Sequence, residues 1–147
     1  MNRFAMTIAT TALFMGTPGN IGVAAHEIMS NQATAASYID TYNAGDIAEM
    51  RKLMHPEIQW ISVEGSAFEV AADGREALVE QMTAYFASPS VPRSTYEQII
   101  ENGRFLTMRE TAHWTDSAGK QQAQSSIAVY EFERGLVRRV WYFPAQK

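Results

Sequence analysis

Residues 94–144 read STYEQIIENGRFLTMRETAHWTDSAGKQQAQSSIAVYEFERGLVRRVWYFP, a stretch of alternating apolar and polar residues. Three turn signals divide it: Asn102-Gly103, Asp116 to Gly119, and Arg134-Gly135. The first and third favour two-residue hairpins, in which glycine supplies the positive φ that the turn requires. The second suits a three-residue loop that pairs Asp116 with Lys120. The stretch therefore predicts a four-stranded antiparallel meander.

These turns sort the side chains onto two faces, because neighbouring residues of a strand point to opposite sides. The face that we expect to be the inner one is mostly apolar and contains Ile99, Leu106, Met108, Ala112, Trp114, Ala128, Tyr130, Phe132, Val137, Trp141 and Phe143, with Glu110, Ser126 and Arg139 among them. The outer face is expected to carry Tyr96, Ile100, Phe105, Ile127, Val129, Val140 and Tyr142 beside Arg109, His113, Glu131 and Arg138. The loop after Asp116 places Ser126 directly across from Glu110.

The chain before the meander predicts three helices and one strand. Apolar residues at helical spacing indicate a helix over residues 31–43 that ends at Gly45, and Asp46 with Glu49 caps a second helix. A strand from Ile58 to Val63 follows, and Asp73 opens a third helix that ends near Ser88. The predicted fold class is α+β, with three helices packed on the inner face of a cone-like, curved antiparallel sheet.

Residues 1–25 have the pattern of a secretory signal peptide. Arg3 precedes an apolar run from Phe4 to Met15, and small residues end at Ala25, where cleavage is expected. Residues 26–147 then form a single domain, because they suffice for one hydrophobic core. The expected location is outside the cytoplasm, in a bacterial periplasm.

The composition argues against several classes of function. The chain has a net charge of −4 at pH 7 and no basic cluster longer than Arg138-Arg139, so we expect neither nucleic acid nor a membrane surface as a partner. It contains no cysteine, which excludes disulfides and thiolate chemistry. His26, His55 and His113 show no metal-binding spacing, so no metal and no cofactor is expected.

Three short motifs carry a resemblance to a known family. They are the run from Tyr38-Ile39 through Ala44-Gly45-Asp46-Ile47, the His55-Pro56 step before a strand with a tryptophan, and Asp73-Gly74-Arg75-Glu76. Together with the order of elements, they resemble the nuclear transport factor 2-like superfamily, also called cystatin-like. Within it, residues 31–144 look most like SnoaL-type polyketide cyclases and ketosteroid isomerase. The resemblance implies a cone with a pocket inside.

The resemblance carries over to only one catalytic position. Tyr38 matches the tyrosine of the isomerase's oxyanion hole. The isomerase's catalytic base falls on Ser62 and its second acid near Ala128, so we do not expect steroid isomerisation by that mechanism. The SnoaL-type cyclases use a histidine and aspartate pair inside the cone, whereas His113 sorts to the outer face.

Glu110 is the main catalytic candidate, with Tyr38 as a second. Glu110 lies among apolar residues, where a carboxylate must find a partner or stay protonated. Arg139 is expected about 13 Å along the sheet at ~3.3 Å per residue, so Arg93 is the nearer cation. A structural contact between Glu110 and an arginine is the alternative interpretation. The candidate ligand-binding residues are Trp60, Ser62, Glu64, Trp114, Ser126, Tyr130, Arg139 and Trp141, although the aromatic ones could simply fill the core.

Three functional hypotheses remain open at this point. The first is a protein that binds a small hydrophobic molecule in its pocket without catalysis. The second is a lyase, isomerase or cyclase that works by acid-base chemistry with Glu110 and Tyr38. The third is an assembly domain. With any of them we expect a homodimer through the outer sheet face, because that face is too apolar to be solvated.

Overall fold

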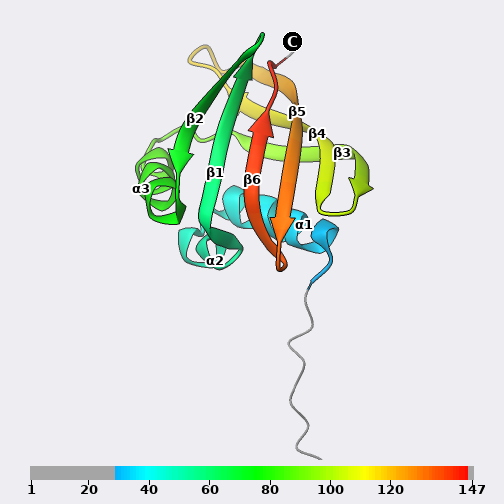
Figure 1. Cartoon of the computed structure of the whole chain (residues 1–147). Coiled ribbons are helices and arrows are strands. Elements are labelled where there is room, and N and C mark those ends of the chain that lie inside the picture. Colours follow the sequence, from blue (N-terminus) through cyan, green and yellow to red (C-terminus); the bar gives the residue numbers. More distant parts are fainter. Residues whose placement is uncertain (1–28, 146–147) are drawn as a thin grey trace, which may run out of the picture.

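The computed structural model describes residues 29–145 (Figure 1). The predicted signal peptide lies outside the described residues. A six-stranded, curved and unclosed sheet forms one layer, and three helices cover its concave side, as the sequence predicts. No helix in the described part of the chain is long and apolar enough to cross a membrane.

The helices are α1 (Asn31–Ala44), α2 (Ile47–Lys52) and α3 (Arg75–Phe86). Gly45 follows α1 with a φ of 66°, a left-handed conformation that glycine adopts without a steric penalty, and its N–H caps the carbonyls of the last turn. The Asp46 carboxylate accepts a hydrogen bond of 3.0 Å from the Glu49 N–H. Both predicted caps are therefore confirmed, and they set the sharp turn between the first two helices.

The start of α3 differs from the prediction. A strand that the sequence did not reveal, β2 (Ala67–Asp73), precedes the helix and pairs with β1 (Met54–Glu64). Its side chains are mostly exposed, so its sequence lacks a buried alternating pattern. Asp73 is the last residue of β2, where its carboxylate accepts a hydrogen bond from Gln59, and Gly74 takes the cap position instead.

The remaining strands are β3 (Arg93–Asn102), β4 (Phe105–Thr115), β5 (Gln121–Glu133) and β6 (Leu136–Tyr142). They form the predicted antiparallel meander, and the sheet order is β2-β1-β6-β5-β4-β3. β1 and β6 run parallel, so the sheet is not purely antiparallel. The loop after β4 pairs Asp116 with Lys120 as predicted, and Glu110 lies opposite Ser126.

A β-bulge reverses the predicted faces of β6. The turn at Arg134 pairs Glu133 with Leu136 as expected, but the register shifts between Glu131 and Phe132. Glu131 therefore faces Arg139, where the sequence predicted Arg138. The extra residue in the bulge sends Val140 and Tyr142 to the inner face and Arg139, Trp141 and Phe143 to the outer one.

A second bulge changes β3. The β3–β4 turn pairs Asn102 with Phe105, so its central residues are Gly103 and Arg104, one position later than expected. The register shifts again near Gln98, which has a φ of 56°. Ser94 and Tyr96 consequently face inward, against the prediction for Tyr96. Arg93 lies opposite His113 and is exposed, so it cannot serve as the cation for Glu110.

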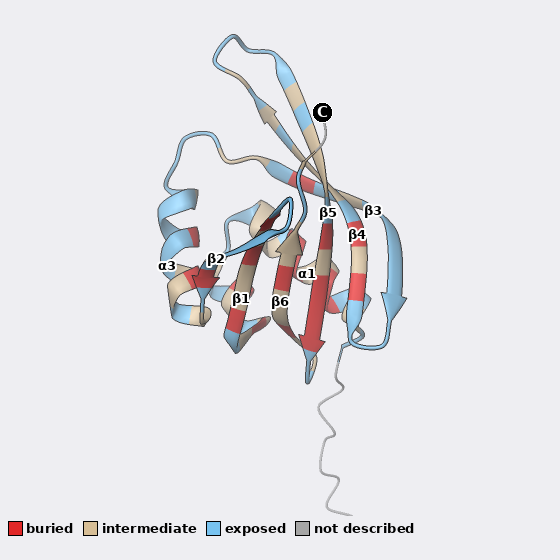
Figure 2. Ribbon diagram, turned by 45° about the horizontal axis from the view of Figure 1, so that its top comes forward, coloured by how far each residue is buried: buried red, intermediate tan, exposed pale blue. Residues whose placement is uncertain are grey.

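The core lies between the sheet and the helices. Figure 2 shows buried residues along the middle of β1, β6, β5 and β4. The far ends of β4 and β5 extend as an exposed hairpin beyond this core (Figure 2). The largest completely buried side chains are Tyr130, Met50, Met54, Ile58, Leu78, Leu106, Met108 and Val137.

Candidate functional site

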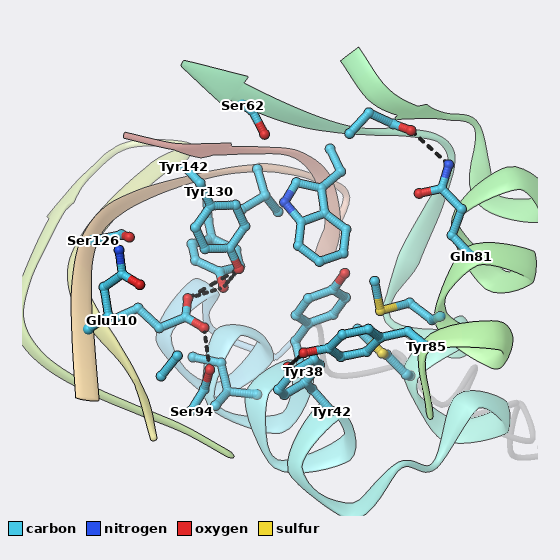
Figure 3. A pocket seen from close by; sticks show the side chains of 18 residues that line it. Tyr38, Tyr42, Ser62, Gln81, Tyr85, Ser94, Glu110, Ser126, Tyr130 and Tyr142 are labelled. Atoms are coloured by element: carbon cyan, nitrogen blue, oxygen red, sulfur yellow. Dashed lines mark hydrogen bonds between the residues drawn. The ribbon is translucent and has the colours of Figure 1, made fainter. Parts of the chain in front are cut away.

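A cavity of about 580 Å³ lies between the concave face of the sheet and the three helices. Its lining is rich in tyrosine and contains Tyr38, Ile39, Tyr42, Met50, Trp60, Ser62, Ala71, Gln81, Met82, Tyr85, Ser94, Glu110, Ala112, Gln124, Ser126, Tyr130, Val140 and Tyr142. Figure 3 shows Ser94, Tyr130 and Tyr142 around Glu110, and Tyr42, Tyr85 and Gln81 on the side of the helices. The size suits a small organic molecule.

Glu110 lies on the cavity wall with three hydroxyl groups around its carboxylate (Figure 3). The Ser94 hydroxyl donates a hydrogen bond of 2.7 Å to Oε1. The Tyr130 and Tyr142 hydroxyls donate to Oε2 over 3.1 and 3.2 Å, and the two phenol oxygens lie 3.3 Å apart. The carboxylate is thus held by neutral donors from three strands.

Burial raises the pKa of Glu110 above its ordinary value, and the three hydroxyl donors oppose this rise. None of the described residues that line the cavity is lysine, arginine or histidine, so no cation compensates the carboxylate from the cavity wall. Glu110 therefore keeps its proton to a higher pH than an exposed glutamate does. Such a group suits proton transfer.

The phenols around the carboxylate stay protonated. Burial, and then the charge of Glu110, raise the pKa of Tyr38, Tyr130 and Tyr142. Tyr38 packs edge-on against Tyr130, with ring centroids 6.2 Å apart. Its hydroxyl makes no hydrogen bond with any residue that the structure describes, and Figure 3 shows it directed into the cavity. Tyr38 can therefore donate to an oxygen atom of a ligand.

Asn43, near the end of α1, holds Ser94 in place. Its side-chain amide donates to the Ser94 carbonyl oxygen over 2.8 Å, and its Oδ1 accepts from the Ser94 N–H over 2.7 Å. These two hydrogen bonds to the Ser94 backbone resemble those that a neighbouring strand would make, and they connect α1 to β3. This joint between α1 and β3 fixes the position of the Ser94 hydroxyl, which contacts Glu110.

The other end of the cavity is formed by α3 and β2. The Gln81 amide donates to the Ala71 carbonyl oxygen over 2.7 Å, and the hydroxyls of Tyr42 and Tyr85 lie 3.3 Å apart. Ala71, Gln81 and Tyr85 are exposed, so this side is the mouth. Glu110 lies away from these exposed residues, at the inner end of the cavity (Figure 3).

The structure brings six of the predicted site residues together on the cavity wall. They are Tyr38, Trp60, Ser62, Glu110, Ser126 and Tyr130. Their roles remain predictions, but their placement is consistent with a shared site. The pairing of Glu110 with Ser126 follows directly from the three-residue loop.

Four other predicted ligand-binding residues lie outside the cavity. The bulge in β6 turns Arg139 and Trp141 to the outer face, where Arg139 forms a 2.7 Å ion pair with Glu131. Trp114 is on the inner face but in the projecting β4–β5 hairpin, opposite Gln122. Glu64 ends β1 in an exposed turn. The alternation of side chains predicts on which face of the sheet a residue lies, but not whether its position along the strand is level with the cavity.

Sequence reasoning missed several lining residues. Ser94 and Tyr142 were hidden by the two bulges, for which the local sequence gives no glycine signal. Tyr42 and Tyr85 lie on the apolar stripes of their helices and could have been chosen by the same argument as Tyr38.

In the part of the chain that the structure describes, no three histidine, aspartate or glutamate side chains gather as a metal site. Glu110 has only hydroxyl neighbours among its hydrogen-bond partners.

The curved sheet, the three helices and the enclosed cavity define an α+β cone of the nuclear transport factor 2-like superfamily. Residues 35–140 match the model of the SnoaL-like domain, and the chain belongs to this family. No curated protein matches the sequence.

Solved structures share the same fold. A cystatin-fold protein of unestablished function from Novosphingobium aromaticivorans is 26% identical with a TM-score of 0.65, and the match covers 79% of this chain and 99% of that one. A candidate SnoaL-like polyketide cyclase from Shewanella denitrificans is 12% identical with a TM-score of 0.64, covering 79% and 90%. An epoxide hydrolase from M. tuberculosis is 9% identical with a TM-score of 0.64, covering 77% and 80%.

Proposed function

We propose that this protein binds a small, mostly apolar molecule in its cavity and moves a proton on it, as an isomerase, cyclase or lyase would. The observation that carries the proposal is Glu110, a cavity carboxyl whose hydrogen-bond partners are neutral hydroxyls only. A candidate polyketide cyclase has the same fold, which is compatible with this class of chemistry but does not specify a substrate.

The proposed step assigns one role to each of two residues. The ionised Glu110 takes a proton from the carbon beside a ligand carbonyl, and the C–H electron pair forms a carbon–carbon double bond. The carbonyl π electrons move to its oxygen, to which the Tyr38 hydroxyl donates a hydrogen bond. Glu110 then returns the proton to carbon. A raised pKa makes Glu110 a stronger base than an ordinary glutamate.

A second candidate function is ligand binding without catalysis. It is favoured by the fact that both oxygens of Glu110 already accept hydrogen bonds from protein hydroxyls. A fully satisfied polar group can also serve only to order the core. In this case the cavity would carry its ligand unchanged.

Hydrogen exchange distinguishes the two candidates. Small cyclic ketones such as cyclohexanone and 2-tetralone are incubated with the protein in D₂O, and loss of the α-hydrogens is followed by NMR. We expect exchange by the wild type to fall about 100-fold in Glu110→Gln, the size typical of a lost acid-base group. Glu97→Gln, the same change at an exposed glutamate on β3, should keep the wild-type rate. Ketone binding without faster exchange than in Glu110→Gln would support the binding function instead.

We also propose that the protein acts outside the cytoplasm, in a bacterial periplasm. The support is the signal-peptide pattern of residues 1–25 in the sequence. Edman sequencing of the protein recovered from a periplasmic extract should begin at His26. An intact N-terminus and recovery only from the cytoplasm would contradict export.

A further inference from the structure

The cavity contains many groups that can hydrogen-bond but none that can neutralise an anion. Its described polar lining consists of hydroxyls, two glutamines and Glu110, and Figure 3 shows the hydroxyls of Ser94, Tyr130 and Tyr142 turned toward the carboxylate. A carboxylate ligand would therefore be buried without a counter-charge, which is strongly unfavourable. An ionised Glu110 would repel it as well.

The arginines on the outer face of the sheet cannot move in to compensate. Arg139 lies on the outer face, where it binds Glu131 and Gln59. Arg109 is paired there with Glu97, and Arg138 with Glu57. The sheet itself separates these side chains from the cavity, so a rotamer change does not bring them to the ligand.

The walls of the cavity favour a flat ring. Tyr38, Tyr130 and Tyr142 surround the inner end, and the Trp60 indole lies 5.5 Å from the Tyr142 ring, centroid to centroid. Aromatic walls of this kind pack well against ring systems by stacking and edge contacts. A carbonyl or phenol oxygen on the ring would find donors and acceptors at Glu110 and the phenols.

We propose that the cavity selects neutral ring compounds with a carbonyl or phenol oxygen and rejects the corresponding carboxylates. Glu110 is the residue that determines this selectivity. The inference rests on the cavity assigned under the proposed function, but it does not require proton transfer.

The test compares three probes of one ring system by isothermal titration calorimetry at pH 7.5: 2-naphthol, methyl 2-naphthoate and 2-naphthoate. Only the last is ionised at this pH. The ester is larger than the acid, so it separates the effect of charge from the effect of size. We expect the naphthol and the ester to bind at least tenfold more tightly than the carboxylate.

Glu110→Gln then tests the assigned residue. Because the variant removes the negative charge with almost no change in shape, we expect it to narrow the difference between ester and carboxylate several-fold. Glu97→Gln should leave that difference unchanged. Equal binding of the ester and the carboxylate by the wild type would overturn the inference, and so would failure of all three probes to bind. If the wild type prefers the ester over the carboxylate but does not exchange the α-hydrogens of the ketones, only the proposed function is overturned.

Discussion

At the scale of single residues, the protonation of Glu110 depends on two opposing effects. Desolvation favours the neutral acid, and the hydroxyls of Ser94, Tyr130 and Tyr142 favour the carboxylate. Desolvation is the larger effect, so the pKa rises. The same three hydroxyls keep the carboxyl at a fixed place on the cavity wall, which a proton-transfer step requires.

The raised pKa predicts how stability depends on pH. The folded state holds the Glu110 proton more tightly than the unfolded chain, so this group contributes stability at pH values below its unfolded pKa. That contribution is lost as the pH rises through the folded pKa. Urea denaturation of the wild type and Glu110→Gln across this range should show the wild type losing stability relative to the variant. A difference that does not change with pH would contradict the raised pKa.

At the scale of elements, the caps around the α1–α2 turn and the loop after Asp116 could be predicted from the sequence, because each depends on a local residue type. Gly45, Asp46 and the loop after Asp116 each act within a few residues of themselves. They were sufficient to predict the first two helices and the pairing of Glu110 with Ser126, whereas the β3–β4 turn lies one residue later than predicted and Gly74, not Asp73, caps α3. The strand β2 was missed because it is exposed on both sides over most of its length.

The bulges could not be predicted from the alternation of side chains. One extra residue moves every later residue of the strand to the opposite face of the sheet. One physical signal was available. Uninterrupted alternation placed the cation of Arg139 inside an apolar cone, where its burial would be costly. A shift by one residue places Val140 and Tyr142 there instead, as the structure has them.

The joint between α1 and β3 gives a prediction for Asn43. Asn43→Ala removes both hydrogen bonds to the Ser94 backbone and leaves these groups without their partners, so we expect a loss of about 1–3 kcal/mol. Asn31→Ala is the control, because this asparagine at the other end of α1 bonds Glu101 and Gly103 at an exposed site. Denaturant unfolding of both variants measures the difference. An equal, small loss in both would show that the joint is unimportant.

At the scale of the whole molecule, the outer face of the sheet carries apolar side chains beside its ion pairs, and no helix among residues 29–145 covers it. Ile61 and Val63 are nearly buried within it, and Trp141 joins it because of the bulge in β6. Exposed apolar side chains on this face include Phe68, Val70, Ile100, Phe105, Ile127 and Phe143. Patches of this kind usually mark an interface.

We predict that a second copy of the chain covers this face and forms a homodimer. Analytical ultracentrifugation at micromolar concentration should give the mass of two chains. Val129→Glu places a charge in the middle of the face and should produce monomers, whereas Lys120→Glu, at the tip of the β4–β5 hairpin, should not. A wild type that sediments as a monomer would contradict the prediction.

The ¹³C NMR titration of the Glu110 side-chain carboxyl tests the central claim most directly. The structure predicts a midpoint above 4.5, the ordinary value for glutamate, and a further rise in Ser94→Ala, because one donor to the carboxylate is lost. A Glu110 midpoint at or below 4.5 would show that the hydroxyls outweigh burial, and would contradict the assignment of Glu110 as the group that moves a proton.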